Sequence, residues 1–234
     1  MISAVIPAYN EEQVLEASVR SVAAIVARLS PLEWEVVIVD DGSCDRTARI
    51  AALFTYDSHF ILEQHEHNRG KGAAVRTGVS RTRGDVVLIC DADLSTPPSM
   101  LQPFLAELSG GADIVTGDRR CDAANIERPQ TFLRRFMGSV YVAFARTITG
   151  VDLRDFNCGF KLFRGEVARS LFEQCRSDRW TWDVEVIALA KKSGLAVRAV
   201  PVTWRQGDRS SVHPFSAAFQ SLADLVRVWI RIRA

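Results

Sequence analysis

The chain has 234 residues, 47% apolar and 24% charged, which is typical of one globular α/β domain with a full hydrophobic core. Its 29 Lys and Arg residues nearly balance 28 Asp and Glu residues, and the net charge of +1 excludes a general attraction to nucleic acid. The five cysteines are scattered singly, which indicates neither a zinc site nor a disulfide framework and favours a cytoplasmic protein.

Strands alternate with helices along the chain. Short apolar, β-branched runs predict strands, and apolar residues at helical spacing predict helices. The expected strands are residues 2–6, 35–39, 60–63, 86–90 and 113–116, and the expected helices are residues 11–28, 45–54 and 71–81. This alternation predicts a single α/β domain, Rossmann-like, with a mainly parallel sheet and helices on both faces. No apolar run approaches the ~20 residues of a membrane span, and the N-terminus leads into a strand rather than a signal peptide.

Three of the predicted strands end in polar motifs. "PAYNEE" follows the first strand, "VDDGSCDRT" ends the second and "CDADLS" ends the fourth. Ligands of parallel α/β sheets bind at the carboxyl ends of the strands, so the three motifs are expected to share one crevice. Two like charges ~4 Å apart, such as Asp91 and Asp93, repel by roughly 4 kcal/mol at an effective dielectric constant of 20. Mg²⁺ or Mn²⁺, which prefer oxygen ligands, would compensate them; the alternative is a pair of solvated turn aspartates or helix caps.

The motif "NRGKG" places Arg69 and Lys71 at the start of a predicted helix. It is not a P-loop, which would need glycine in place of His65 and Ser or Thr in place of Gly72. Positive charge opposes the helix dipole there, so these side chains indicate a nearby anion, unless they are simply solvated. His65 and His67 lack a third zinc ligand and are expected to be solvated.

Several motifs together resemble those of a known family. "VIPAYNEE", "VVIVDDGSCDRT", "NRGKGAAVRTG" and "DVVLICDADLS" are similar to the successive motifs of the family 2 inverting glycosyltransferases, which have the nucleotide-sugar-binding GT-A fold. "IVTGDRR", "DFNCGFKLF", "RWTWDVEV" and "PVTW" resemble the branch that glycosylates polyprenyl phosphates, most closely the dolichyl-phosphate β-glucosyltransferases. The resemblance covers nearly the whole chain in the right order. We expect a GT-A domain at residues 1–214, followed by a C-terminal helix at residues 215–234.

The resemblance also implies a donor site and a metal site. The expected donor-binding residues are Pro7, Ala8, Tyr9, Glu11, Asp40, Asp41, Lys71, Asp91, Ala92 and Asp93. Asp40 or Asp41 would accept an imide N–H, which both uracil and guanine possess. Asp93, with Asp91 nearby, would hold Mg²⁺ or Mn²⁺ against the leaving diphosphate. Ser95 is a weaker candidate ligand, because archaeal mannosyl relatives have a glutamine at this place and a hydroxyl binds metal less well.

The implied reaction transfers a hexose, with inversion, from a nucleoside diphosphate sugar to a polyprenyl phosphate of the dolichyl or undecaprenyl type. UDP-glucose is the favoured donor. The acceptor phosphate has a second pKa near ~6, so it is already ionised and needs no strong base. By resemblance, Arg119 and Arg134 bind this phosphate, with Arg205 and Arg209 on a closing loop. Asp91, Asp93, Arg119 and Asp183 are the expected catalytic residues, although Asp183 could instead serve the dipole of the helix that follows it.

Other functions are weighed against this one. The same reaction with GDP-mannose or a UDP-N-acetylhexosamine stays open. A sugar nucleotidyltransferase should have a glycine-rich loop with a lysine after its first strand, and "PAYNEE" has neither. A non-catalytic nucleotide-sugar-binding protein would have lost Asp91 or Asp93, and both are present.

The C-terminal segment predicts an amphipathic helix. Its apolar stripe contains Phe215, Phe219, Leu222, Val226 and Trp229, and another face contains Gln220, Asp224, Arg227 and Arg231. The helix either packs on the domain or lies in a membrane interface, where basic residues favour anionic headgroups by roughly 1 kcal/mol each. We therefore expect a cytoplasmic protein, peripheral on the cytoplasmic face of a membrane, for which a separate membrane protein could also serve as anchor.

Overall fold

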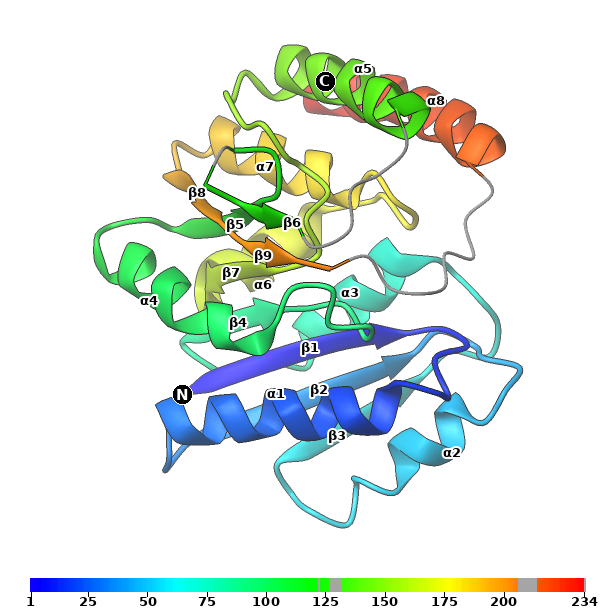
Figure 1. Ribbon diagram of the computed structural model, residues 1–234, viewed down its shortest axis with the longest axis vertical. Coiled ribbons are helices and arrows are strands. Elements are labelled where there is room, and N and C mark those ends of the chain that lie inside the picture. Colours follow the sequence, from blue (N-terminus) through cyan, green and yellow to red (C-terminus); the bar gives the residue numbers. More distant parts are fainter. Residues whose placement is uncertain (122, 127–131, 206–213, 234) are drawn as a thin grey trace.

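A seven-stranded sheet forms the centre of the fold (Figure 1). The computed structural model describes residues 1–121, 123–126, 132–205 and 214–233, with only the backbone for residues 125–126, 132–137 and 214–222. The strand order is β3-β2-β1-β4-β7-β5-β8. These strands are β1 (Ile2–Ala8), β2 (Trp34–Asp40), β3 (Phe60–Gln64), β4 (Val86–Ile89), β5 (Ile114–Asp118), β7 (Lys161–Arg164) and β8 (Val197–Pro201). The short strands β6 (Asn125–Ile126) and β9 (Thr203–Trp204) pair separately.

Helices cover both faces of the sheet, as the alternating pattern predicts. The helices are α1 (Leu15–Leu29), α2 (Thr47–Ala52), α3 (Lys71–Ser80), the 3-10 turn η1 (Pro98–Met100), α4 (Leu101–Ser109), α5 (Phe132–Thr149), α6 (Gly165–Gln174), α7 (Trp182–Lys192) and α8 (Pro214–Arg233). One core contains side chains of α1, α2 and α4, and the other contains side chains of α3, α5, α6 and α7. Successive residues of β1 enter opposite cores, Ala4 the first and Val5 the second, so this strand is apolar throughout.

The sheet is parallel except at β7, which lies antiparallel to both β4 and β5. The predicted mainly parallel sheet is therefore confirmed, and β7 is the element that alternation alone did not predict. In the other half, β1 pairs in parallel with β2 and β4. The three strands that end in polar motifs are thus neighbours, and their carboxyl ends lie at one edge of the sheet.

Two predicted helices are shorter than expected at their N-termini. Helix α1 begins at Leu15 rather than at residue 11, because residues 11–14 form a turn in which the Val14 N–H bonds to the Glu11 carbonyl at 3.1 Å. Asn10 before it has a φ of 56°, a left-handed conformation that a helix cannot continue through. Helix α2 covers Thr47–Ala52 rather than residues 45–54, since Asp45 bonds to the Thr47 N–H from outside the helix.

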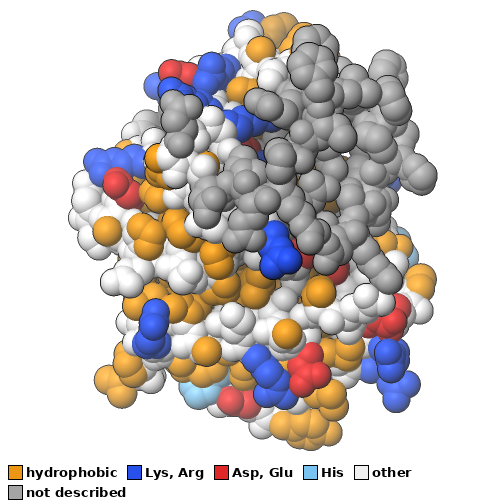
Figure 2. All heavy atoms as spheres, in the orientation of Figure 1, with side chains coloured by type: hydrophobic (Ala, Val, Ile, Leu, Met, Phe, Trp, Pro, Cys, Tyr) orange, Lys and Arg blue, Asp and Glu red, His pale blue; other side chains and the backbone are white. Residues whose placement is uncertain are grey.

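Helices α5 and α8 pack against each other and against α7, and form an outer layer at the top of Figure 1. Within the described chain, no helix is long and apolar enough to cross a membrane. At the opposite end, around α1 and α2, apolar side chains are exposed among charged ones (Figure 2).

Candidate active site

The loops after β1 and β2 are bonded into one wall of the crevice. The Asn10 N–H donates to Ser43 Oγ at 2.9 Å, and Asn10 Oδ1 accepts the Cys44 N–H at 2.9 Å. The Glu11 N–H donates to Thr47 Oγ1 at 2.8 Å. These bonds fix the two motifs relative to each other, so a ligand at the strand ends would meet both.

The donor residues predicted in "PAYN" differ in exposure. Pro7 and Ala8 are buried at the end of β1, while the Tyr9 side chain after them is 42% exposed. An exposed aromatic ring beside a crevice offers a face on which a base can stack. Pro7 and Ala8, the last residues of β1, form the buried part of this wall.

The two aspartates of "VDDGS" have different environments. Asp41 accepts four bonds: its Oδ1 from His65 Nδ1 (2.6 Å) and the Arg69 N–H (3.0 Å), and its Oδ2 from Asn68 Nδ2 (2.9 Å) and the Gly70 N–H (2.8 Å). Asp40 is also buried, but the one hydrogen bond to its carboxylate among the described residues comes from the Ser43 N–H at 3.3 Å. Asp41 therefore holds the loop of residues 68–70, and Asp40 keeps acceptor capacity for a ligand.

His65 is not the solvated side chain that the sequence predicted. Its side chain is only 6% exposed, and Nε2 lies 3.0 Å from Thr77 Oγ1 while Nδ1 contacts Asp41. His67, the other histidine of the motif, is exposed as expected. The periodicity of the strand did not predict this burial, because the partners of His65 are Asp41, which follows β2, and Thr77 of α3.

Lys71 and Asp91 form an ion pair between the start of α3 and the loop after β4. Lys71 begins α3, so the anion that the sequence analysis expected near this helix start is a carboxylate of the protein itself. Burial opposes the charged forms of both groups, but their mutual attraction outweighs it: the pKa of Asp91 is lowered and that of Lys71 is raised. The Lys71 ammonium also lies 5.6 Å from the ring centre of Trp180.

Asp93 is more exposed than Asp91, and Ala92 between them is buried. The Asp93 carboxylate accepts the Ser95 N–H at 2.9 Å and the Ser95 hydroxyl at 2.7 Å. The Ser95 carbonyl in turn accepts the Arg205 N–H at 2.9 Å, which joins the acidic loop to the segment after β9. Asp93 and Ser95 therefore present a carboxylate and a hydroxyl side by side at the mouth of the crevice.

Glu11 responds electrostatically to this acidic cluster. Partial burial, followed by the negative charges of Asp93, Asp91 and Asp45, raises the pKa of Glu11 from its ordinary value of 4.5 to about 7. Burial is the larger cause, so the raised pKa shows mainly that Glu11 is partly desolvated, and the neighbouring aspartates add to the effect. The cluster of Glu11, Asp45, Asp91 and Asp93 gives this edge of the sheet carboxylates that a cation would compensate.

The donor groups fit a hard divalent cation that is held partly by its substrate. Asp91, Asp93 and Ser95 supply oxygen atoms only, which suits Mg²⁺ or Mn²⁺. No group of three His, Cys, Asp or Glu side chains arranged to hold a metal occurs in the described part of the chain. One or two carboxylates would leave coordination positions to water and to a diphosphate, as is usual for Mg²⁺ sites.

Arg119 follows β5 and is held by Asp155. Its Nε and Nη2 donate to the two oxygens of the Asp155 carboxylate at 2.6 and 2.9 Å. Burial opposes the charge of Arg119, but Asp155 outweighs it, so the pKa of this guanidinium is raised. Its Cζ also lies 5.4 Å from the ring centre of Trp204. The side chain is 20% exposed and is held in a fixed orientation.

The other three predicted acceptor residues are only partly described. Arg134 lies in α5, in the part for which the backbone alone is described, and Arg209 lies outside the described residues. Arg205 is exposed directly after β9. The structure thus brings Arg119 and Arg205 to the side of the crevice that carries β9, and the roles of all four arginines stay predictions.

Asp183 is buried, 4% exposed, and forms an ion pair with Lys161 of β7. Burial raises the pKa of Asp183, against the opposing effect of Lys161 and Lys71. Lys161 is fully buried; its ammonium donates to the carbonyls of Phe156 (2.9 Å) and Cys158 (2.6 Å). The sequence analysis missed Lys161, and the signal that was available is a lysine inside the apolar strand "GFKLF".

Solved structures define the class of fold. Glucosyl-3-phosphoglycerate synthase from Mycobacterium tuberculosis, in complex with Mn²⁺, UDP and glucosyl-3-phosphoglycerate, superposes with a TM-score of 0.75 at 22% identity, covering 97% of this chain and 79% of that chain. Its complex with Mn²⁺, UDP-glucose and phosphoglyceric acid also gives 0.75, at 21% identity, covering 98% and 79%. The fold is that of the GT-A glycosyltransferases.

Sequence comparison gives the family. The model of glycosyl transferase family 2 matches residues 3–172, and the chain belongs to this family. A dolichyl-phosphate beta-glucosyltransferase of Dictyostelium discoideum is 31% identical, covering 98% of this chain and 74% of the relative. The enzymes of the same name from Drosophila melanogaster and Homo sapiens are 33% and 29% identical, covering 98% and 99% of this chain and 74% and 75% of the relatives. The predicted family and the glycosyltransferase class are confirmed.

Proposed function

We propose that the protein transfers glucose from UDP-glucose to a polyprenyl phosphate of the dolichyl type, with inversion, to give a polyprenyl monophosphate glucose. The observation that carries this proposal is the similarity, along nearly the whole chain, to relatives named dolichyl-phosphate beta-glucosyltransferase. A phosphate oxygen of the acceptor attacks the anomeric carbon, and the bond from that carbon to the diphosphate breaks, with its electron pair leaving on UDP. No proton has to be removed from an ionised phosphate.

Asp40 is the proposed acceptor for the imide N–H of the base. Asp41 is already filled by four donors, whereas Asp40 keeps acceptor capacity at the buried end of β2. Tyr9 would stack on the base, with Pro7 and Ala8 behind it. This arrangement supports recognition of uracil by an acidic group, while Glu11 lines the path from the base to the acidic loop.

Asp93 and Asp91, assisted by Ser95, are the proposed holders of Mg²⁺ or Mn²⁺, which when bound would neutralise the charge developing on the leaving diphosphate. The clustering of Glu11, Asp45, Asp91 and Asp93 supports a cation here, and the repulsion among these carboxylates adds to the effect of burial in raising the pKa of Glu11. Lys71 fixes the Asp91 carboxylate on the crevice side of β4 and adds a positive charge near the same diphosphate.

Arg119 is the proposed first contact of the acceptor phosphate. Asp155 holds its Nε and Nη2, which leaves Nη1 to donate to an incoming phosphate from a fixed position. Arg134, Arg205 and Arg209 are proposed to complete the acceptor site. Asp183, bound to Lys161, is proposed to stabilise the floor of the sugar site rather than to exchange protons with substrate.

A polyprenyl acceptor requires access to a bilayer, and the outer layer of α5 and α8 is the proposed contact. Val140 and Phe144 on α5 and Val226, Trp229 and Ile230 on α8 are large apolar side chains that are 38–56% exposed. Basic residues of the last turns, among them Arg233, would favour anionic headgroups. Attachment to the cytoplasmic face, aided by a separate anchor protein, is part of this proposal.

The decisive experiment assays the purified chain with a short polyprenyl phosphate and a panel of UDP and GDP sugars. We expect glucosyl transfer from UDP-glucose, a β-linked product and loss of turnover in excess EDTA. Transfer from GDP-mannose or a UDP-N-acetylhexosamine instead would correct the donor. Transfer to water or to a soluble phosphate only would contradict the proposed acceptor.

A further inference from the structure

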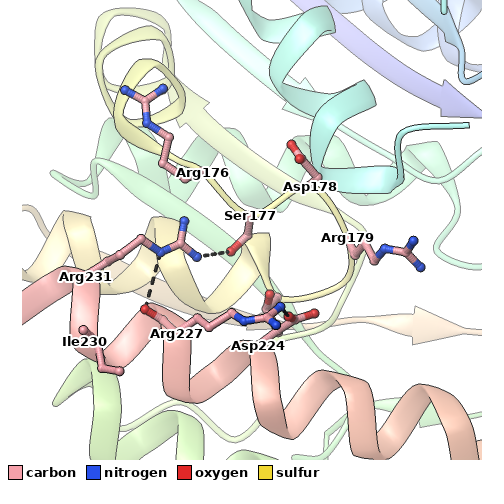
Figure 3. Close-up of a pocket in the computed structure, with 9 residues that line it drawn as sticks. Arg176, Ser177, Asp178, Arg179, Asp224, Arg227, Ile230 and Arg231 are labelled. Atoms are coloured by element: carbon pink, nitrogen blue, oxygen red, sulfur yellow. Dashed lines mark hydrogen bonds and ion pairs between the residues drawn. The ribbon is translucent and has the colours of Figure 1, made fainter. Parts of the chain in front are cut away.

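A cavity lies away from the candidate active site, between the turn that joins α6 to α7 and the last turns of α8 (Figure 3). Its volume is about 530 Å³, large enough for a phosphoryl group with an organic substituent. The lining residues are Arg176, Ser177, Asp178, Arg179, Thr181, Asp224, Arg227, Ile230 and Arg231. Figure 3 shows Arg231 reaching from α8 to Ser177 of the turn and Arg227 lying along α8 toward Asp224, while the side chains of Arg176 and Arg179 extend from the turn in different directions away from Ser177.

The cavity is rich in guanidinium groups. Arg227 is paired with Asp224 at 2.8 Å, and Arg231 with the buried Glu185 at 3.1 Å. Asp178, the remaining acidic residue of the lining, is paired with Arg76. Arg176 and Arg179 are exposed, and within the described part of the chain neither forms an ion pair. In each ion pair the positive and the negative charge compensate each other. Arg176 and Arg179 therefore give the cavity lining an excess of two positive charges.

The wall between the turn and α8 is held in place. Glu185 Oε2 accepts the N–H groups of Arg176 at 3.1 Å and Ser177 at 2.7 Å, while its Oε1 binds Arg231. Arg231 also donates to Ser177 Oγ at 3.2 Å. A buried carboxylate thus fixes the turn and the arginine of α8 together, and preorganised donors lose less entropy when a ligand binds.

The chemistry of the lining selects for phosphate. Guanidinium groups form paired hydrogen bonds to phosphate oxygens and keep their charge at every physiological pH. Ile230 supplies an apolar wall on the solvent side and is 56% exposed. We propose that this cavity is a binding site for a phosphate group, separate from the donor and acceptor sites, and that Arg176 and Arg179 supply the charge that attracts it.

The same turn supports the catalytic crevice. The carbonyls of Asp178 and Arg179 accept the N–H groups of Ala73 (3.0 Å) and Gly72 (3.2 Å) in the first turn of α3. Trp180, the next residue, lies over the ammonium of Lys71. A phosphate bound in the cavity would contact the turn that positions Lys71, so bound phosphate is expected to change the kinetics of transfer as well. This step rests on the proposed function; the binding site itself does not.

The test compares two double variants of the full chain. Arg176→Gln with Arg179→Gln removes the unpaired charges of the cavity, and Arg28→Gln with Arg49→Gln removes the same charge from exposed sites on α1 and α2. Inorganic phosphate is titrated by calorimetry at constant ionic strength, in separate titrations with and without UDP, so that occupancy of the donor site and competition for the cavity are both measured. Hydrogen exchange with and without phosphate then localises the binding.

We expect phosphate to protect residues 176–181 from exchange, and the cavity variant to bind phosphate at least about tenfold more weakly while the control binds like the wild type. Equal phosphate binding by both variants, or protection elsewhere only, overturns the site.

Flotation then identifies the source of the phosphate group. It compares vesicles that contain phosphatidic acid with vesicles that contain a fatty acid at the same charge. Selective loss of phosphatidic acid binding in the cavity variant assigns a lipid headgroup, and loss of free phosphate binding alone assigns a soluble phosphate. UDP binding and UDP-glucose turnover, measured alongside, test the proposed function separately.

Discussion

The carboxylate of Asp91 lies directly against the α-carbon of Gly159, so that a β-carbon on Gly159 would come within 2.0 Å of Asp91 Oδ2 and 2.3 Å of its carboxyl carbon. Asp91 is fixed on its other side by Lys71. The position of the first acidic residue of "DAD" therefore depends on a glycine 68 positions later in the chain, in the segment leading to the antiparallel strand β7.

Gly159→Ala is expected to displace Asp91 and break its pairing with Lys71. Glucosyl transfer should fall at least about tenfold, and the free energy of unfolding by about 1–3 kcal/mol, as for overpacking of a tight site. Steady-state kinetics and urea denaturation measure the two effects. The matched control is Gly110→Ala, whose new β-carbon would lie 3.2 Å from the end of the Arg198 side chain and 3.4 Å, an ordinary contact distance, from the carbonyl oxygens of Ala106 and Glu107. Full activity of Gly159→Ala would show that Gly159 does not position Asp91.

Asp93→Asn is expected to abolish turnover and leave the fold intact. Asp93 is exposed, and its hydrogen bonds within the described part of the chain go to Ser95, so the amide keeps the turn and loses the charge that would hold the cation. Mn²⁺-dependent binding of UDP-glucose and the melting temperature measure both effects. Asp152→Asn, at a side chain that is 91% exposed, serves as the control and should retain activity. Mn²⁺-dependent turnover of Asp93→Asn at the wild-type rate would contradict the metal assignment.

Arg119→Lys is expected to impair use of the acceptor more than binding of the donor. Lysine conserves the charge but cannot bond both oxygens of Asp155 and a phosphate from one planar group. The KM for polyprenyl phosphate should rise at least about tenfold, as expected for the loss of a charged hydrogen bond, while UDP-glucose binding changes little. Arg154→Lys, an exposed position, is the control. Unchanged acceptor kinetics would take Arg119 out of the acceptor site.

The sequence predicted the parallel half of the fold because its signals are local. The strand ends at "PAYNEE", "VDDGS" and "CDADLS" converge as expected, since β2, β1 and β4 are neighbours. Gly159 was not linked to Asp91, and β7 was not placed between β4 and β5, because neither the alternation of elements nor the spacing of residues reports an antiparallel insertion. Both relationships depend on the order of the strands in the sheet. The local periodicity of the sequence gives no information about that order.

Within the site, sequence reasoning identified residue types but not their partners. It proposed Asp40 and Asp41 as equivalent candidates, and only the contacts of His65, Asn68 and the backbone of the following loop distinguish them. It left Asp183 as either a catalytic residue or a partner of the helix dipole, and the structure shows the side chain bound to Lys161 in the interior. A buried polar pair joins segments that are distant in the sequence, so the residues that flank either partner do not indicate the pair.

Glu11→Gln is expected to change how stability depends on pH. The folded protein raises the pKa of Glu11 to about 7, so between pH 4.5 and 7 it holds a proton that the unfolded chain releases. This contribution to stability is present below pH 4.5 and is lost as the pH rises to 7. Glutamine does not ionise, so the variant should lose less stability than the wild type across this window. Urea denaturation in metal-free buffer measures the slopes; Glu173→Gln, an exposed position, should behave like the wild type. Parallel slopes for wild type and Glu11→Gln would refute the shifted pKa.

Helix α8 has one face packed on the domain and one face exposed. Leu225 and Val228 are buried, whereas Val226 and Trp229, which belong to the apolar stripe predicted from the sequence, are 49% and 38% exposed. Ending the chain after Val226 would remove Val228 and the partner of Glu185, so loss of binding by that truncation could reflect unfolding. Substitution of the exposed side chains is therefore the cleaner test of a membrane contact.

We expect the double variant Val226→Gln with Trp229→Gln to bind vesicles of anionic lipid at least about tenfold more weakly than the wild type, because both side chains lose the apolar area that would enter the interface. Leu53→Gln with Tyr56→Gln removes two side chains that are 65% and 93% exposed near α2, at the other end of the molecule, and should float like the wild type. Binding of the wild type should also weaken as salt rises, since the arginines of α8 contribute electrostatically. If both double variants float as well as the wild type, the exposed face of α8 is not the membrane contact, and attachment must come from another surface or from an anchor protein.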